Sequence, residues 1–473
     1  MIVRTTAGSV QGIARGDTFG FLGVPYAAPP VGANRLLAPA PVAPWDGVRA
    51  ATAYGATAFQ PDQEFTLIPE PKDPGDDFLN LNVFTPDPGA AGLPVLVWIH
   101  GGGFTQGCGN STWYAGDQFC RDGIVTVAIN YRLGAEGFAV IDGAPTNRAV
   151  RDWIAALEWV RDNIAAFGGD PSQVTIGGQS AGAAACVTLM TAPGARGLFR
   201  NVIAMSGSAG NVAPITAARV PATAQRLADQ IGVECTRDGF AACSPWALID
   251  AQIACGTTWD GPPMHYAPVA GDDVVPELPH DAIARGEAAE VGLLIGATRD
   301  EARPLFLLTG QKFDDDRMRR HLGRTGLDDA AIAAYRAALP GFAPWEVMAR
   351  ARSDTTFRLP GLRLARARGG APTFHYDFAW ESPALGGVGA GHCVDVPFVF
   401  DVLGDAHAKT VLGDSAPQSL ADTVHAAFVA FVKGDQPWPL FDESEPTMVF
   451  DGNGARIETS VLATADAAFP STA

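Results

Sequence analysis

The pentapeptide Gly178-Gln179-Ser180-Ala181-Gly182 constrains the fold of this chain more than any other stretch of the sequence. It follows the β-branched run Val174-Thr175-Ile176 and precedes a run of small and apolar residues. A strand, a tight glycine turn and a helix in this order describe a nucleophile elbow, in which a strained turn exposes the serine hydroxyl. Glycines flank the serine because a Cβ at either position would collide with the neighbouring strand or helix. The alternative interpretation is a structural strand-turn-helix with an unreactive serine.

Buried strands and helices alternate on both sides of this turn. Residues 93–100 and 124–129 carry apolar residues on both faces, as in strands of a parallel sheet that is covered on both faces. Between Asn147 and Phe167 the apolar residues recur at three- and four-residue spacing, which predicts an amphipathic helix. The same patterns predict strands at 202–205 and 293–296 and a last helix at about 420–433. This alternation indicates an α/β protein with βαβ units around a mostly parallel sheet.

The length and composition are compatible with one large domain. The chain has 473 residues, of which 47% are hydrophobic, so it has ample apolar material for a core. Length alone suggests two to four domains of roughly 150 residues, but α/β folds often run longer as one unit. We therefore expect a single domain over residues 1–473, with helical insertions over the sheet at about 211–290 and 312–370.

The charge and the terminal sequence limit the partners and the location. The net charge is −18, which argues against nucleic acid as a partner, because a polyanion requires a basic surface. No stretch of about 18 apolar residues is present, so we expect no membrane-spanning helix. The first residues contain no apolar segment of the secretory type, so we expect a cytoplasmic protein, with secretion left open.

The cysteine pattern indicates neither a metal cluster nor a disulfide framework. The chain has seven cysteines and no Cys-x-x-Cys motif. Cys235 and Cys243 are close enough in sequence to bridge a short loop. The other interpretation is that both remain free thiols, as in a reducing compartment.

A serine nucleophile requires a base and an orienting acid. Imidazole is the best proton acceptor near neutral pH, and His392 is the leading candidate because it ends the flexible turn Gly389-Ala390-Gly391. His100 is better placed for a structural role. In this fold type the acid falls between serine and histidine in the chain. Asp300 and Glu301 follow a predicted strand there, and the residue pattern alone does not separate them.

A glycine run after another predicted strand supplies donors for an oxyanion. In His100-Gly101-Gly102-Gly103-Phe104 the successive glycines allow backbone N–H groups to point at one site. Such fixed donors contribute roughly 3–4 kcal/mol each to the transition state. Ala181, the residue after the serine, adds a further N–H. A phosphate-binding loop is excluded because no Lys-Ser/Thr pair follows the glycines.

Together these motifs resemble the type-B carboxylesterases, the family that includes the cholinesterases. The resemblance runs nearly from end to end and is carried by blocks at residues 21–30, 79–83, 100–104, 130–138, 167–182 and 206–208. It implies an α/β-hydrolase fold, a mostly parallel sheet flanked by helices with insertions over the active site, and a serine esterase that needs no metal or organic cofactor. It assigns the acid to Glu301, the base to His392, and the oxyanion donors to Gly102, Gly103 and Ala181.

The resemblance also implies the reaction and its alternatives. Small-molecule esters are the expected substrates, and Phe104, Phe306 and Phe398 are candidates for the apolar pocket wall, with ordinary core packing as the alternative for each. An amidase, a carbamate hydrolase or a thioesterase would use the same site. Some relatives are non-catalytic adhesion modules, but these typically lose a member of the triad.

The sequence departs from the family at two places. Gln179 replaces the glutamate that usually precedes the serine, which removes a negative charge beside the site. Ala58 and Phe78 stand where secreted relatives carry cysteines, and the loop between them contains no tryptophan. Because cholinesterases use a tryptophan of this loop for cation–π recognition, we expect choline esters to be poor substrates.

Overall fold

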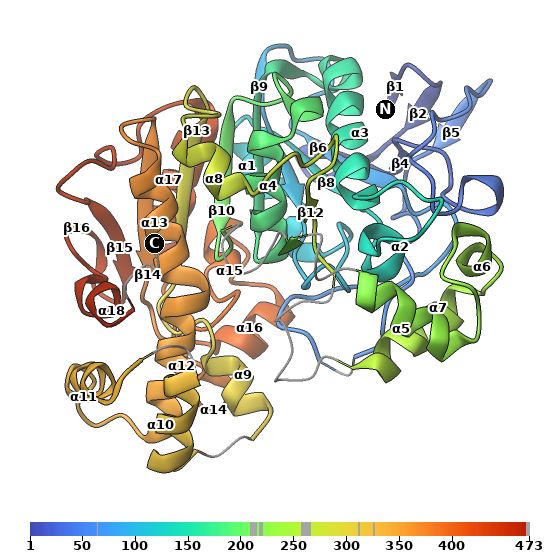
Figure 1. The fold of residues 1–473 in the computed structure, drawn as a ribbon. Helices are drawn as coiled ribbons and strands as arrows, with labels where there is room; N and C mark the ends of the chain where they lie inside the picture. The colour runs from blue at the N-terminus through green and yellow to red at the C-terminus, as the bar shows by residue number, and fades with distance from the viewer. Residues whose placement is uncertain are drawn as a thin grey trace.

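The computed structural model describes residues 1–63, 65–208, 215–216, 221–256, 266–310, 313–324 and 327–469. Within these residues a sheet of 11 strands forms the centre of the molecule, with helices on both of its faces (Figure 1). In spatial order its strands are β16 (Gly454–Glu458), β15 (Thr447–Asp451), β14 (Thr373–Phe378), β13 (Gly292–Thr298), β10 (Asn201–Met205), β9 (Gly169–Gln179), β7 (Leu93–Ile99), β8 (Val125–Ile129), β6 (Asn80–Thr85), β4 (Thr18–Pro25) and β3 (Ile13–Arg15).

The centre of this sheet is parallel and its edges are antiparallel. All neighbouring pairs from β8 to β15 run parallel. At the edges β16, β6, β4 and β3 pair antiparallel with their neighbours. The sequence therefore predicted the parallel centre correctly. Outside the central sheet lie β1 (Ile2–Arg4), β2 (Ser9–Gln11) and β5 (Val48–Ala50) in one small sheet, and β11 (Ile215–Thr216) and β12 (Val269–Ala270) in another.

The helices cover the sheet and extend beyond its carboxyl edge. They are α1 (Asp117–Arg121), α2 (Gly134–Phe138), α3 (Arg148–Asn163), α4 (Ala181–Thr191), α5 (Pro221–Ile231), α6 (Arg237–Ala241), α7 (Pro245–Cys255), α8 (Pro279–Ala284), α9 (Arg303–Leu308), α10 (Asp315–Arg324), α11 (Asp329–Ala337), α12 (Pro344–Ser353), α13 (Leu359–Ala367), α14 (Ala384–Gly387), α15 (Val396–Val399), α16 (Ala406–Leu412), α17 (Gln418–Lys433) and α18 (Ala463–Ala468).

Side chains of a central strand alternate between two hydrophobic cores. In β7, Val95 and Val97 join the core on the α3 and α4 side, whereas Leu96 and Trp98 join the core that includes α17. All four side chains are buried. Covering on both faces explains why this strand is apolar throughout instead of alternating with polar residues.

The predicted insertions contain helices, as far as the structure describes them. Residues 211–290 hold α5 to α8, while 211–214, 217–220 and 257–265 lie outside the described residues. Residues 312–370 hold α10 to α13. In Figure 1, α10, α11 and α12 lie at the lower left near α9, and α5 and α7 lie at the lower right. The boundaries of the predicted insertions remain a prediction.

Two smaller expectations concern the cysteines and the membrane. Cys235 and Cys243 are both free thiols, and the Cys243 thiol donates to the carbonyl of Gly239 over 3.4 Å. In the part of the chain that the structure describes, every helix is too short or too polar to span a bilayer.

Candidate active site

Ser180 occupies a strained turn between β9 and α4. Its backbone has φ 58° and ψ −123°, a combination that a residue with a side chain rarely adopts. The Ser180 N–H donates to the carbonyl of Met205 over 2.8 Å, and its carbonyl accepts from Ala184 over 3.0 Å in the first turn of α4. The strand on one side and the helix on the other therefore fix the turn, while the serine residue itself remains partly exposed.

Glycines around the elbow allow backbone to pack on backbone. A Cβ on Gly182 would overlap the carbonyl oxygen of Ile99, and a Cβ on Gly178 would overlap the carbonyl group of Gly182. A Cβ on Gly207 would overlap the carbonyl oxygen of Ser180. The elbow is thus wedged between β7 and the segment after β10, and it has no room for larger residues.

The glycine run after β7 lies against this elbow. A Cβ on Gly101 would come within 2.7 Å of the Gln179 carbonyl oxygen and 3.3 Å of the Ser180 Cβ. Gly102 and Gly103 have φ values of +101° and +62°, which glycine adopts without strain. The N–H groups of Gly102, Gly103 and Ala181 donate no hydrogen bond within the described part of the chain. All three are therefore available to an oxyanion beside the serine.

His100 supports this glycine run from behind. Its ring is buried, stacks on Tyr131 with centroids 4.3 Å apart, and places Nδ1 2.8 Å from the Gly101 carbonyl oxygen. Burial lowers the pKa of His100 to about 4, so the ring is neutral at neutral pH. These contacts fit the structural role that its position in the sequence predicts.

Glu301 and His392 form a directly bonded pair. The Glu301 Oε2 is hydrogen-bonded to Nδ1 of His392, and Oε1 accepts from the N–H of Thr298 over 2.8 Å. The Glu301 side chain is fully buried, whereas the His392 side chain is 21% exposed. Both carboxylate oxygens of Glu301 are therefore held by hydrogen bonds. The Nε2 side of the His392 ring points away from the carboxylate.

Asp300 has different partners from Glu301. Its Oδ1 forms an ion pair of 2.6 Å with Arg350, and its N–H donates to the carbonyl of Ala390 over 2.7 Å. Asp300 thus ties the acidic loop to α12 and to the turn before His392. Only the second acid of the pair contacts the imidazole.

The surroundings of His392 favour the protonated ring. Burial opposes the imidazolium, but interactions with the Cys393 and Glu301 side chains outweigh it and raise the pKa of His392 well above its usual value. Burial also raises the pKa of the Cys393 thiol. Because that thiol is neutral near pH 7, Glu301 is the charged neighbour that stabilises an imidazolium there.

Gln179 brings the imidazole to the elbow. Its Nε2 lies 3.2 Å from Nε2 and 3.4 Å from Nδ1 of His392. An atom almost equidistant from both ring nitrogens lies against the face of the ring instead of in line with either nitrogen. Since Gln179 immediately precedes Ser180, the imidazole lies beside the serine turn.

The three predicted pocket phenylalanines are packed against other aromatic rings. Phe104 lies 4.8 Å from Phe138, Phe398 lies 5.1 Å from Phe378, and Phe306 lies 5.4 Å from Phe313, measured between ring centroids. All three are buried. These are contacts of core residues, and a role in the pocket wall stays a prediction.

Phe357 is the aromatic residue that sequence reasoning missed. Its ring centroid lies 5.2 Å from that of His392, with the two planes at 42°. No motif marks Phe357 in the sequence, because the helix that carries it reaches His392 only in the folded chain.

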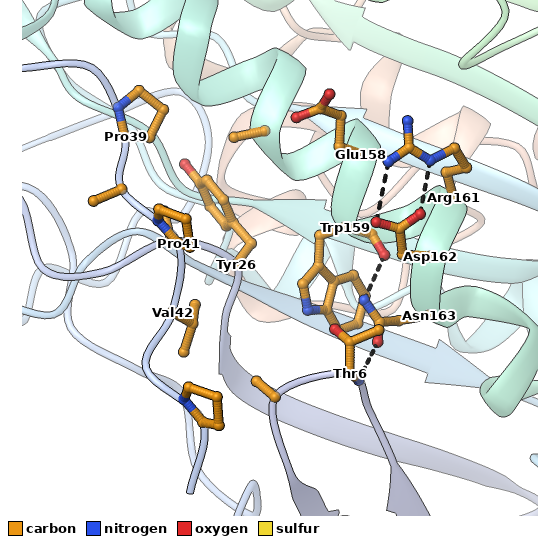
Figure 2. Close-up of a pocket in the computed structure, with 15 residues that line it drawn as sticks. Thr6, Tyr26, Pro39, Pro41, Val42, Glu158, Trp159, Arg161, Asp162 and Asn163 are labelled. Carbon is orange, nitrogen blue, oxygen red and sulfur yellow. Dashed lines mark hydrogen bonds and ion pairs between the residues drawn. The ribbon is translucent and has the colours of Figure 1, made fainter.

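A hollow of about 360 Å³ is lined by none of the residues of this site. Its lining includes Tyr26 and Pro41 and, from the last turn of α3, Glu158, Trp159, Arg161, Asp162 and Asn163 (Figure 2). The chain continues from this turn to the start of β9, whereas Ser180 follows the end of β9. The hollow therefore lies at the opposite edge of the sheet from the elbow.

Comparison with known proteins identifies the family. Residues 1–456 match the carboxylesterase family. Phenmedipham hydrolase of Pseudarthrobacter oxydans is 36% identical, with 96% of each chain covered. Para-nitrobenzyl esterase of Bacillus subtilis is 33% identical over 95% of this chain and 94% of its own. The crystal structure of a carboxylesterase from Geobacillus stearothermophilus superposes with a TM-score of 0.89 at 32% identity, covering 99% of both chains.

The chain belongs to the carboxylesterase family. The predicted α/β-hydrolase fold is confirmed, with a large mixed sheet flanked by helices. The protein is a carboxylic ester hydrolase, and its family acts on small-molecule esters.

Proposed function

We propose that this esterase works through an acyl-enzyme on Ser180, with His392 as the base and Glu301 as the orienting acid. The observation that supports this assignment best is the continuous set of contacts from the buried Glu301 to His392, and from His392 through Gln179 to the serine turn. A base that contacts both an orienting carboxylate and the segment of the nucleophile is the arrangement that acyl transfer requires.

The reaction has two steps. Ser180 Oγ attacks the ester carbonyl carbon while His392 takes the serine proton, and His392 then protonates the departing alcohol. Water attacks the acyl-enzyme in the second step, again losing its proton to His392, and Ser180 is released with its proton restored. Glu301 stabilises the imidazolium that forms in both steps, and the N–H groups of Gly102, Gly103 and Ala181 bind the oxyanion.

The rest of the proposal concerns the protein as a whole. We propose that residues 1–473 act as one domain, with the helical insertions at about 211–290 and 312–370 enclosing the substrate. The net charge of −18 favours small molecules over nucleic acid as partners. A cytoplasmic location remains part of this proposal.

The test compares the wild type with Ser180→Ala on short and medium p-nitrophenyl esters. We expect hydrolysis by the wild type and none above background by the folded variant. Equal activity in both would refute the assignment of the nucleophile. Phenmedipham and a p-nitrobenzyl ester belong in the same panel, because relatives carry their names, and an amide, a carbamate and a thioester separate the alternative activities of this site.

A further inference from the structure

One turn of π-helix interrupts the long helix beside the active site. Asp354–Arg358 joins α12 to α13, and the N–H of Leu359 donates to the carbonyl of Asp354, five residues earlier. Pro360 gives a reason for this wide turn. In a regular α-helix its ring would clash with the carbonyl of Thr356, and its missing N–H would leave that carbonyl unpaired. A single π-turn inside an α-helix is rare and often marks a functional site.

Buried charges hold this turn in place. Arg358 is ion-paired with Asp354 in the same turn and with Asp377 of β14, the latter over 2.8 Å. Arg299 contacts the other oxygen of Asp377 over 2.6 Å, and Tyr335 donates to Asp354. Arg358, Asp354 and Asp377 are almost completely buried. The turn is therefore anchored to the sheet and is a fixed part of the fold.

The same helix contacts the acidic loop at two levels and His392 at a third. Arg350 pairs with Asp300, and the Ser353 hydroxyl accepts from the N–H of Ala302 over 3.0 Å. These two contacts hold the residues on either side of Glu301. One turn further along, Phe357 lies against the imidazole of His392.

Phe357 lies on the same side of this helix as Arg350 and Ser353. Residues at positions i, i+3 and i+7 share one face of an α-helix, so the helix that places Arg350 and Ser353 on the acidic loop also directs residue 357 towards the imidazole. The ion pairs of the π-turn hold Phe357 in this position.

We propose that Phe357 positions the catalytic histidine by packing its ring against the imidazole. With Glu301 bonded to Nδ1 and the Gln179 amide over the ring, Phe357 restricts rotation of the imidazole as it accepts and returns protons. Phe357 is a positioning residue that acts through His392. This inference rests on the proposed function, in which His392 is the base.

The kinetic test uses Phe357→Leu, which keeps apolar volume but removes the ring, and Phe357→Tyr, which keeps the ring. For p-nitrophenyl acetate we expect Phe357→Leu to lower kcat about 10- to 100-fold, the cost of a loosened catalytic group, with KM almost unchanged. Phe357→Tyr should retain most of the wild-type kcat. Phe441→Leu is the matched control, because Phe441 packs 5.8 Å from His375, a histidine outside the site, and it should leave kcat unchanged.

Two kinetic results would overturn the proposal. One is a raised KM at unchanged kcat. The other is a loss confined to esters with long acyl chains. Either result would make Phe357 a wall of the substrate pocket instead of a support for the base.

A spectroscopic readout separates this proposal from the proposed function. The proton of His392 on Nδ1, bonded to Glu301, gives a downfield proton NMR signal that His392→Gln removes. We expect Phe357→Leu to broaden this signal and speed its exchange with water, and Phe357→Tyr to preserve it. If Phe357→Leu broadens the signal but the wild type hydrolyses none of the esters tested, the positioning role stands and the proposed function is refuted. An unchanged signal in Phe357→Leu would refute the positioning role.

Discussion

The nucleophile side and the acid–base side of this site are built in different ways. Ser180 is fixed by backbone contacts, which glycines at 178, 182 and 207 make possible. Glu301 and His392 are held by their own side-chain bond and by the Thr298 N–H, and side chains of a helix that begins at Pro344 hold the residues on either side of Glu301. The glycine positions around Ser180 tolerate almost no increase in residue size. Several separate contacts support Glu301 and His392, so we expect that each can be changed by substitution without losing the others.

The largest expected effect is on the acid–base side, at the carboxylate itself. Glu301→Gln should lower kcat by roughly 10⁴-fold, because an amide leaves the imidazole in the wrong tautomer and without its counter-charge. Activity needs the neutral ring, so the rate rises with pH through the pKa of His392. Since Glu301 helps raise that pKa, its loss should move the acidic limb of the pH–rate profile to lower pH.

The neighbouring acid provides the control for this prediction. Asp300→Asn breaks the ion pair with Arg350 but leaves the Glu301–His392 bond in place. It should reduce stability and keep kcat within about tenfold of the wild type, because Asp300 acts on the catalytic groups only through neighbouring residues. Equal losses in the two variants would erase the distinction between the two acids.

On the nucleophile side, Gly182→Ala should destabilise the fold. The new Cβ would overlap the Ile99 carbonyl oxygen, and overpacking of this kind costs about 1–3 kcal/mol. A shift of the turn should lower kcat as well. Urea unfolding measures the stability, and Gly323→Ala is the control, because a Cβ there meets nothing within 4 Å. Full stability and activity in Gly182→Ala would show that the elbow is not wedged as described.

A buried carboxyl makes the acid–base side sensitive to pH. Burial, followed by the charge of Glu301, raises the pKa of Asp395 to about 7, and Tyr376 donates to this carboxyl over 3.0 Å. Between about pH 4 and 7 the folded state keeps a proton that the unfolded state has lost, so this group's contribution to stability falls as pH rises. Asp395→Asn should remove that contribution.

Denaturant unfolding at pH 5 and pH 8 tests this prediction. The free energy of unfolding of Asp395→Asn, relative to that of the wild type, should be about 1–2 kcal/mol more favourable to the variant at pH 8 than at pH 5. This value is below the full free energy that corresponds to such a shift in pKa. The same difference at both pH values would contradict a raised pKa.

The smallest expected effect concerns Gln179. Gln179→Glu restores the carboxylate that the family usually carries and places a second negative charge beside His392. The pKa of His392 should rise further, because an opposite charge within hydrogen-bond distance stabilises the imidazolium. The acidic limb should move to higher pH, with kcat at its optimum changed only about threefold. A shift to lower pH would contradict the contact.

This contrast also explains what the sequence revealed. The elbow, the glycine run and the buried strands are local patterns, so the predicted strand at 293–296 differs from β13 by only a residue or two at each end. The strand before the elbow is longer than predicted, because β9 begins at Gly169. The contacts of Phe357, Ser353 and Arg350 join segments distant in sequence, and no local pattern marks them. For the same reason the residue pattern could not separate Asp300 from Glu301.

The central claim is that Ser180 is the nucleophile served by His392 and Glu301. It is tested most directly by treating the wild type, Ser180→Ala and Glu301→Gln with an organophosphate ester and locating the phosphoryl group by mass spectrometry. We expect one phosphoryl group per wild-type chain, on Ser180, with parallel loss of activity. Glu301→Gln should be labelled slowly at the same residue, and Ser180→Ala should carry no label. Labelling of Ser180→Ala at another residue, with ester hydrolysis retained, would contradict Ser180 as the nucleophile.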